Sequence, residues 1–268
     1  MKKYTKKLQL FFGVTFSLQH SKLELLGILN LEVIMGKKNY GSCYGDPYQR
    51  FRYLIKYIES YYGRKTKILI PNALDGQHIL PSVRKGYQVD CYETVNEFIN
   101  GGTIGNFNIV GLKAKLDYFN MIDSVTLFEN NFYEQKVERE YEFVYCYKSL
   151  HLEENKNIPR DRKMRKLLSS VKENGFIYIF YHLAENENDY INYPKEQYFR
   201  KYEMQKYFDD SWEIIIAKES NLTSKDNAHP FNEKEHSHLV GHIFARKLYK
   251  RRKYKYTYDI KVGFIDNK

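Results

Sequence analysis

The residue with the clearest chemical potential is Glu93, an acid that directly follows the short apolar run Gln88–Tyr92. The two oxygens of a carboxylate can accept hydrogen bonds from two neighbouring hydroxyl groups, such as those of a ribose. Nucleotide-binding α/β folds place an acid of this kind at the tip of the second strand. A turn glycine, Gly76, and a neighbouring acid, Asp75, precede Glu93 by about the length of one helix and one strand. Together these residues predict a nucleotide-binding site at one edge of a parallel sheet.

The elements around these residues follow the order strand, helix, strand. The apolar run Ile68–Pro71 predicts the first buried strand, and Asn72–Gly76 predicts a turn. A helix is expected over about Gln77–Lys85, with Gly86 as the turn into the second strand, Gln88–Tyr92. Apolar runs that alternate with a helix are typical of a βαβ unit in a parallel sheet.

The rest of the chain continues this alternation. A helix is expected over 48–62, because Phe51, Leu54 and Ile58 recur on one face at helical spacing. The almost wholly apolar run Tyr141–Tyr147 has the composition of a central parallel strand. The other predictions are a short helix at 94–100, a loop at 101–105, a mixed segment at 107–122, strands at 124–128 and 176–181, helices at 160–172 and 196–208, a turn at 174–175, and closing strands at 212–218 and 239–247.

Composition narrows the class of protein. A chain of 268 residues with 43 % hydrophobic residues suits one α/β domain with additions. The three cysteines, Cys43, Cys91 and Cys146, form no CxxC pair, which argues against a disulfide framework and a zinc site. No apolar run reaches the about 18–20 residues of a membrane-spanning helix. We therefore expect a cytoplasmic protein without a membrane span.

Histidines concentrate near the end of the chain, at His229, His236, His238 and His242. In an extended segment His236 and His238 would share one face. A metal site needs three or four converging ligands, and apart from Glu233 and Glu235 no carboxylate or cysteine accompanies these histidines. A solvated loop and a substrate-contacting loop are the alternatives that stay open, and no metal ligands are expected.

The formal net charge of +10 favours anionic partners. Lys247–Lys255 holds several basic residues and no acid. This segment is either a solvated tail or a contact for nucleic acid or a membrane surface. At the other end, residues 1–35 begin basic and continue apolar, as in a signal peptide, but polar residues interrupt the apolar part and no cleavage site is evident. Because the sequence that begins at Met35 looks like a natural protein start, we expect residues 1–34 to be an upstream extension outside the core fold.

The order of elements resembles that of class I S-adenosylmethionine-dependent methyltransferases, nearest to the small tellurite-resistance and thiopurine methyltransferase-like enzymes. The resemblance covers about Asp46–Leu248. It rests on the spacing of the elements and motif positions more than on identical residues. Those enzymes carry a turn of the form P-G-C-G-x-G after the first strand, and Pro71–Gly76 has this spacing here. Gly86, Val89 and Glu93 then follow in the register of the family.

Later elements agree in kind. Asn131-Phe132 stands where the family has an Asp and an apolar residue after the third strand. Residues 142–151 correspond to the family's D-x-V-x-x-x-x-x-L-H strand, and Leu239–Lys247 resembles its last strand. The resemblance implies a Rossmann-like, doubly wound, seven-stranded and mostly parallel sheet with an antiparallel C-terminal strand. Its domain would span residues 36–247, between an extension at 1–35 and a basic tail at 248–268.

The resemblance also implies a site at the carboxyl ends of the strands. His151, just beyond the fourth strand, is the candidate catalytic base. Two glycines of the family's turn are replaced, by Asn72, which tolerates a left-handed φ, and by Leu74, which is harder to reconcile with a bound methionine moiety. The residues that the resemblance assigns to S-adenosylmethionine are Asn72, Asp75, Gly76, Glu93, Asn131, Phe132, Cys146 and Tyr147.

The predicted function is S-adenosylmethionine-dependent methylation of a small molecule. Two alternatives stay open: an inactive methyltransferase-like domain that binds a partner, and an RNA methyltransferase that uses the basic tail. No D/N-P-P-Y/F motif follows the fourth strand, which disfavours methylation of amino groups on nucleic-acid bases. No Pro-Cys nucleophile is present, which disfavours methylation of cytosine C5.

Overall fold

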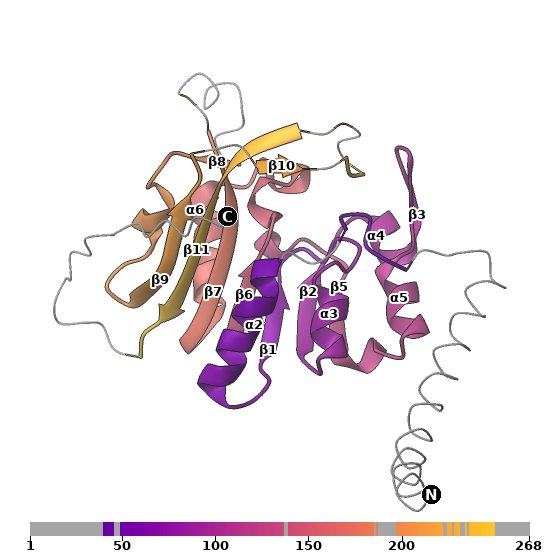
Figure 1. The fold of residues 1–268 in the computed structure, drawn as a ribbon, viewed down its shortest axis with the longest axis horizontal. Coiled ribbons are helices and arrows are strands. Elements are labelled where there is room, and N and C mark those ends of the chain that lie inside the picture. Colours follow the sequence, from indigo (N-terminus) through magenta and orange to yellow (C-terminus); the bar gives the residue numbers. More distant parts are fainter. Residues whose placement is uncertain are drawn as a thin grey trace, which may run out of the picture. The chain divides into compact units, whose positions relative to one another are not determined.

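The structure of this chain is a computed structural model (Figure 1). It describes residues 40–45, 49–136, 139–184, 186, 197–221, 224–226, 228–230, 234 and 236–249. The predicted extension at 1–35 and most of the basic tail lie outside these residues, so the domain limits and the nucleic-acid contact of Lys247–Lys255 stay predictions. No helix in the described part of the chain has the length and apolar character needed to cross a membrane.

One sheet of nine strands organises the described residues, in the order β10-β11-β7-β6-β1-β2-β5, with β8 paired to β7 and β9 paired to β11. The pairs from β5 to β7 are parallel, whereas β11 is antiparallel to both β7 and β9. The predicted fold class is confirmed, with β8 and β10 as short additions. The strands are β1 Lys67–Ile70, β2 Gln88–Tyr92, β5 Val125–Phe128, β6 Tyr141–Cys146, β7 Val171–Leu183, β8 Tyr198–Phe199, β9 Trp212–Glu219, β10 Ser224–Asp226 and β11 His236–Lys247.

Helices cover both faces of this sheet (Figure 1). On one face lie α2 (Gln49–Tyr62), α3 (Ile79–Arg84) and α5 (Leu112–Tyr118), and on the other lies α6 (Arg160–Ser169). The central strands alternate between these two cores: Phe143 and Tyr145 of β6 face the first, and Val144 and Cys146 face the second. Because both faces are buried, the strand is apolar or aromatic apart from Glu142 near its start, which pairs with Arg64 and Lys172.

Three local predictions were wrong. The loop predicted at 101–105 contains β3 (Gly102–Ile104), which pairs in a hairpin with β4 (Phe107–Ile109) and follows α4 (Asn96–Asn100). The predicted turn at 174–175 lies inside β7, where Asn174 has a φ of 61° and the pairing with β6 shifts register. The helix predicted at 196–208 is replaced by β8 and a 3-10 turn, Met204–Tyr207, because residues 198–199 pair with the end of β7.

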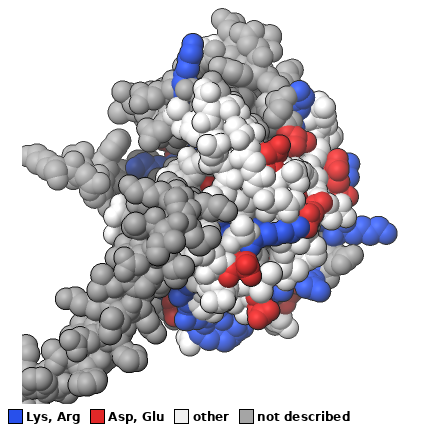
Figure 2. Space-filling view, turned by 90° about the vertical axis from the view of Figure 1, so that its right-hand side faces the viewer, with Lys and Arg blue, Asp and Glu red and all other residues white. Residues whose placement is uncertain are grey.

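The surface charge is mixed over the face drawn in Figure 2, where basic and acidic side chains stand close together. Ion pairs account for part of this mixing in the described residues. Lys113 lies 2.6 Å from Glu129, and Lys67 lies 2.8 Å from Asp90. Because these basic residues are paired with acids, a group of basic residues without such pairs would point to an anionic ligand.

Gly241 is the position where β11 makes room for an aromatic ring. It stands opposite Tyr181 of β7, and a Cβ at Gly241 would lie 2.1 Å from Cζ of the buried Tyr181 ring. We expect Gly241→Ala to lower the free energy of unfolding by about 1–3 kcal/mol, because the ring must move within a packed core. Urea denaturation measures this loss. In a Tyr181→Leu background the same alanine should cost less, and an equal cost in both backgrounds would contradict the explanation.

Candidate functional site

Glu93 directly follows β2, and its side chain is turned into the protein, where it is only 2 % exposed. Its Oε2 accepts a hydrogen bond from the backbone N–H of Leu74 at 2.7 Å. Its Oε1 accepts from the N–H groups of Thr94 at 2.9 Å and Val95 at 3.0 Å. Burial raises the pKa of Glu93 to about 7, although the backbone hydrogen bonds oppose this rise. The acid predicted from the sequence is therefore at the expected strand end and is held by the protein itself.

The turn after β1 approaches Glu93 through Leu74, which has a left-handed φ of 49°. This is the conformation that a glycine adopts without strain. The Leu74 side chain is buried with Phe98 and Ile109 in a small apolar cluster, against which Tyr44 and Leu152 pack. The replacement of glycine by leucine therefore keeps the backbone conformation and adds a packed side chain.

Asn72 ties this turn to the segment that follows β6. Its Nδ2 donates to Oε1 of Glu154 at 3.1 Å and lies 3.4 Å from Oε2 of Glu93. Glu154 belongs to a 3-10 turn, Glu153–Asn155, and burial raises the pKa of its carboxyl. Asn72, Glu93 and Glu154 thus join the carboxyl ends of three strands in one hydrogen-bonded network.

Asp75 and Gly76 face the α5 side of the turn. Asp75 is 1 % exposed and accepts hydrogen bonds from the Ser42 hydroxyl at 2.7 Å and the Cys43 N–H at 2.6 Å. The ammonium group of Lys115, also 1 % exposed, lies 3.2 Å from Oδ2 of Asp75. A Cβ at Gly76 would lie 2.8 Å from Leu112, so this glycine permits close packing of α5.

The other predicted cofactor residues fall into different environments. Asn131 accepts from the N–H of Tyr133 at 2.9 Å, and its Nδ2 donates to Oδ1 of Asn155 at 2.9 Å. Phe132 and Cys146 are buried in the core on the α6 side. Tyr147 packs against the core on the α2 side. The structure therefore brings Asn72 and Glu93 together, and it does not bring Cys146 and Tyr147 to a common surface.

Three histidine rings stack beyond the ends of β6 and β7. His151, in the 3-10 turn Ser149–His151, has its ring centroid 3.6 Å from that of His182 on β7. His182 in turn lies 4.0 Å from His238 on β11. Sequence reasoning singled out His151 and His238 and missed His182, whose only signal is its place near the end of an apolar strand. Within the described residues no group of His, Cys, Asp or Glu side chains could hold a metal ion.

The electrostatics of this stack keep His151 neutral. Burial lowers the pKa of His151 well below its ordinary value, and the positive charge of Lys148 adds to this effect. Nδ1 of His151 has no hydrogen-bond partner among the residues that the structure describes. His242, from the same predicted histidine group, lies apart, with Nδ1 2.6 Å from the Tyr178 hydroxyl.

This chain matches known proteins in its three-dimensional structure and not in its sequence. No known protein family and no curated protein matches the sequence. TehB from Haemophilus influenzae superposes with a TM-score of 0.57 at 15 % identity, over 75 % of this chain and 62 % of TehB. A methyltransferase from Methanosarcina mazei, described as S-adenosylmethionine-dependent, superposes with a TM-score of 0.50 at 14 % identity, over 76 % of this chain and 99 % of its own. This chain has the class I methyltransferase fold.

A third neighbour with the class I fold carries a ligand. Magnesium protoporphyrin IX methyltransferase from Synechocystis, with bound S-adenosylhomocysteine, superposes with a TM-score of 0.50 at 10 % identity, over 74 % of this chain and 82 % of its own. In open α/β sheets, ligands bind beyond the carboxyl ends of the strands. Glu93, the turn at Asn72–Gly76 and His151 all lie at that edge.

The class I fold implies S-adenosylmethionine as the cofactor. Whether it fits depends on the hydrogen-bonding atoms of Glu93 and on the space beside them. Both oxygens of Glu93 already accept protein N–H groups, and the Leu74 side chain is packed beside them. In the described conformation these residues do not fit a ribose on Glu93. Oε2 must first be released by Leu74 and Asn72. The cofactor roles of the eight residues named from the sequence therefore stay predictions.

Proposed function

We propose that this chain is an S-adenosylmethionine-dependent methyltransferase that acts on a small molecule. The observation that carries the proposal is the place of Glu93 in the class I fold. The acid directly follows β2 and reaches the turn after β1, which is where the resemblance puts the ribose-binding acid. The absence of a disulfide among Cys43, Cys91 and Cys146 supports a cytoplasmic location.

In this proposal His151 is the general base. Its Nδ1 forms no hydrogen bond within the described residues, but it is buried there, so a substrate nucleophile could give it a proton only after the histidine stack opens. The lowered pKa keeps the imidazole neutral and also makes it a weak base. The flat contact with His182 restricts the tilt of the His151 ring. Phe180 lies 6.3 Å from His151 and 4.9 Å from Tyr147 between ring centroids, so the neighbourhood of the base is aromatic. Such a lining suits a small, partly apolar substrate.

Leu74→Gly should strengthen S-adenosylmethionine binding at least about tenfold, or about 1.4 kcal/mol. The change removes the packed side chain and leaves a residue that adopts the same left-handed φ. Isothermal titration calorimetry on both proteins measures the effect, with a urea melt to show that the variant is folded. If neither protein binds at millimolar cofactor, the proposed function is wrong.

A second candidate function is favoured by the network of Asn72, Glu93 and Glu154. The network and the Leu74 side chain close the turn with hydrogen bonds and apolar contacts internal to the protein. A domain of this kind would keep the class I fold without a cofactor and would bind a partner instead. The same titration separates the two candidates, because only the methyltransferase gains affinity from Leu74→Gly.

A further inference from the structure

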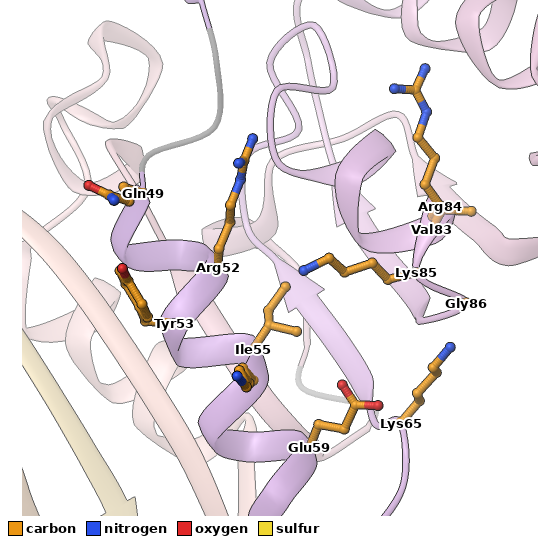
Figure 3. A pocket seen from close by; sticks show the side chains of 11 residues that line it. Gln49, Arg52, Tyr53, Ile55, Glu59, Lys65, Val83, Arg84, Lys85 and Gly86 are labelled. Carbon is orange, nitrogen blue, oxygen red and sulfur yellow. The ribbon is translucent and has the colours of Figure 1, made fainter.

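A cavity of about 890 Å³ lies between α2 and α3, near the amino ends of β1 and β2 (Figure 3). It is separate from the carboxyl edge that holds Glu93 and His151. Its volume is within the range of small-molecule sites, which runs from roughly 300 to 1,000 Å³. We call it the α2–α3 groove.

The lining of the α2–α3 groove is strongly basic. It carries five Lys or Arg residues and one acid, Glu59. Oε2 of Glu59 accepts a hydrogen bond from the Tyr87 hydroxyl at 2.8 Å, and the five cations outnumber this single carboxylate. The basic residues, all exposed, are Arg52, Lys56, Lys65, Arg84 and Lys85.

Most of these cations form no ion pair with another described residue. The side chains of Arg52, Lys56 and Lys85 form no ion pair or hydrogen bond within the described part of the chain, and the same holds for Lys65. Arg84 lies over the Phe119 ring, 4.3 Å from its centroid. This differs from the paired charges elsewhere in the described residues. An unpaired cluster around a concave surface is the signature of an anion site.

Local helix electrostatics explain only part of the cluster. Arg84 and Lys85 stand at the end of α3, where positive charge complements the helix dipole. Arg52 and Lys56 are four residues apart on α2, so their like charges share one face and repel each other. Figure 3 shows Arg52 and Lys85 reaching from opposite walls toward the space between the two helices. A multivalent anion in that space would relieve the repulsion on both walls.

We propose that the α2–α3 groove binds a small molecule that carries two or more phosphate groups. Several cations spread along the lining match several linked phosphates better than one isolated anion. The guanidinium group of Arg52 offers the paired donors that phosphate oxygens accept. The limited extent of the groove, which is lined by α2, the end of α3 and Lys65, favours a small molecule over a continuous nucleic-acid strand. Unlike the proposed methyltransferase function, this site does not depend on Glu93 or on the turn.

Isothermal titration calorimetry of the full chain with inorganic tripolyphosphate at low ionic strength tests the site. We expect one site per chain, whose affinity falls as salt is added. The double variant Arg52→Glu/Lys85→Glu should weaken binding at least about tenfold. The double variant Arg165→Glu/Lys206→Glu is the matched control, because it makes the same change of charge at two exposed residues on the α6 side of the sheet. No binding at millimolar tripolyphosphate, or an equal loss in the control, would overturn the proposal.

Two further titrations identify the source of the phosphates. Adenosine triphosphate that binds at least as tightly as tripolyphosphate, and that is lost in the double variant, supports a phosphorylated small molecule. A single-stranded RNA of about 20 nucleotides that binds more tightly than both at the same salt, and is lost in the same variant, overturns the small-molecule assignment in favour of nucleic acid. Circular dichroism shows that each variant is folded.

Discussion

Replacement of Lys115 by methionine should lower the free energy of unfolding by about 3–5 kcal/mol, the usual cost of removing one member of a buried ion pair. Its ammonium group lies 3.2 Å from Oδ2 of Asp75 and donates to the carbonyl oxygens of Asp75 at 2.8 Å and Gly41 at 3.1 Å. Both charged side chains are 1 % exposed. Without Lys115 the carboxylate of Asp75 stays buried with no opposite charge beside it. Urea denaturation measures the loss.

The chain offers a matched control two residues earlier in α5. Lys113 also pairs with a carboxylate, Glu129 at 2.6 Å, but both partners are about half exposed, at 46 % and 49 %. Lys113→Met should therefore cost no more than about 1 kcal/mol. The double variant Asp75→Asn/Lys115→Met should recover part of the loss, because it removes the orphaned charge. A similar cost for both lysines would contradict the importance of burial.

The central strands were predictable because a strand that is buried on both faces is a continuous apolar run in the sequence. Ile68, Leu69 and Ile70 of β1 pack alternately into the two cores, so the run is apolar throughout. The hairpin β3–β4 has no such signal, since its first strand, Gly102–Ile104, is mostly exposed. The sequence pattern predicts a helix that includes Tyr198–Phe199. In the structure these residues form a strand, because β7 supplies their hydrogen-bonding partners. Tertiary pairing of this kind is not encoded in local periodicity.

For the candidate site, the sequence predicted the position of Glu93 along the chain but not the direction of its side chain or its hydrogen bonds. The register placed Glu93 at the end of β2, and the structure has it there. That Glu93 turns inward depends on the backbone N–H of Leu74, nineteen residues away in sequence, at 2.7 Å. Lys115 attracted no attention in the sequence, because a lysine in a short helix is ordinarily exposed. Its burial follows from Asp75, forty residues earlier, which no local pattern connects to it.

Replacement of Glu93 by alanine should lower the free energy of unfolding by about 2–4 kcal/mol at pH 5. The change leaves the N–H groups of Leu74, Thr94 and Val95 without their acceptor. The buried N–H of Leu74 costs about 1–3 kcal/mol when it is unsatisfied, and those of Thr94 and Val95, which are less buried, add smaller costs. Loss of the acid should also abolish the proposed cofactor binding. Urea denaturation measures stability, and calorimetry measures binding.

The cost of Glu93→Ala should become smaller as the pH rises. The pKa of Glu93 is about 7 in the folded protein and about 4.5 in an unfolded chain. Between these values the folded state holds a proton that the unfolded state has lost, so the stability that Glu93 contributes is greatest below pH 4.5 and falls until about pH 7. The fall is on the order of 3 kcal/mol, because each pKa unit corresponds to about 1.4 kcal/mol.

Two further variants isolate the titration of Glu93 from its hydrogen bonds. Glu93→Gln keeps the size of the side chain and removes its proton equilibrium, so the fall in stability between pH 4.5 and pH 7 should be absent from this variant. Glu134→Ala removes an exposed acid near the same edge and should change stability by no more than about 0.5 kcal/mol at any pH. If the cost of Glu93→Ala instead grows with pH, the carboxylate is stabilised by its three N–H donors more than it is destabilised by burial. The turn at Leu74 would then be an anion-binding turn that Glu93 itself occupies.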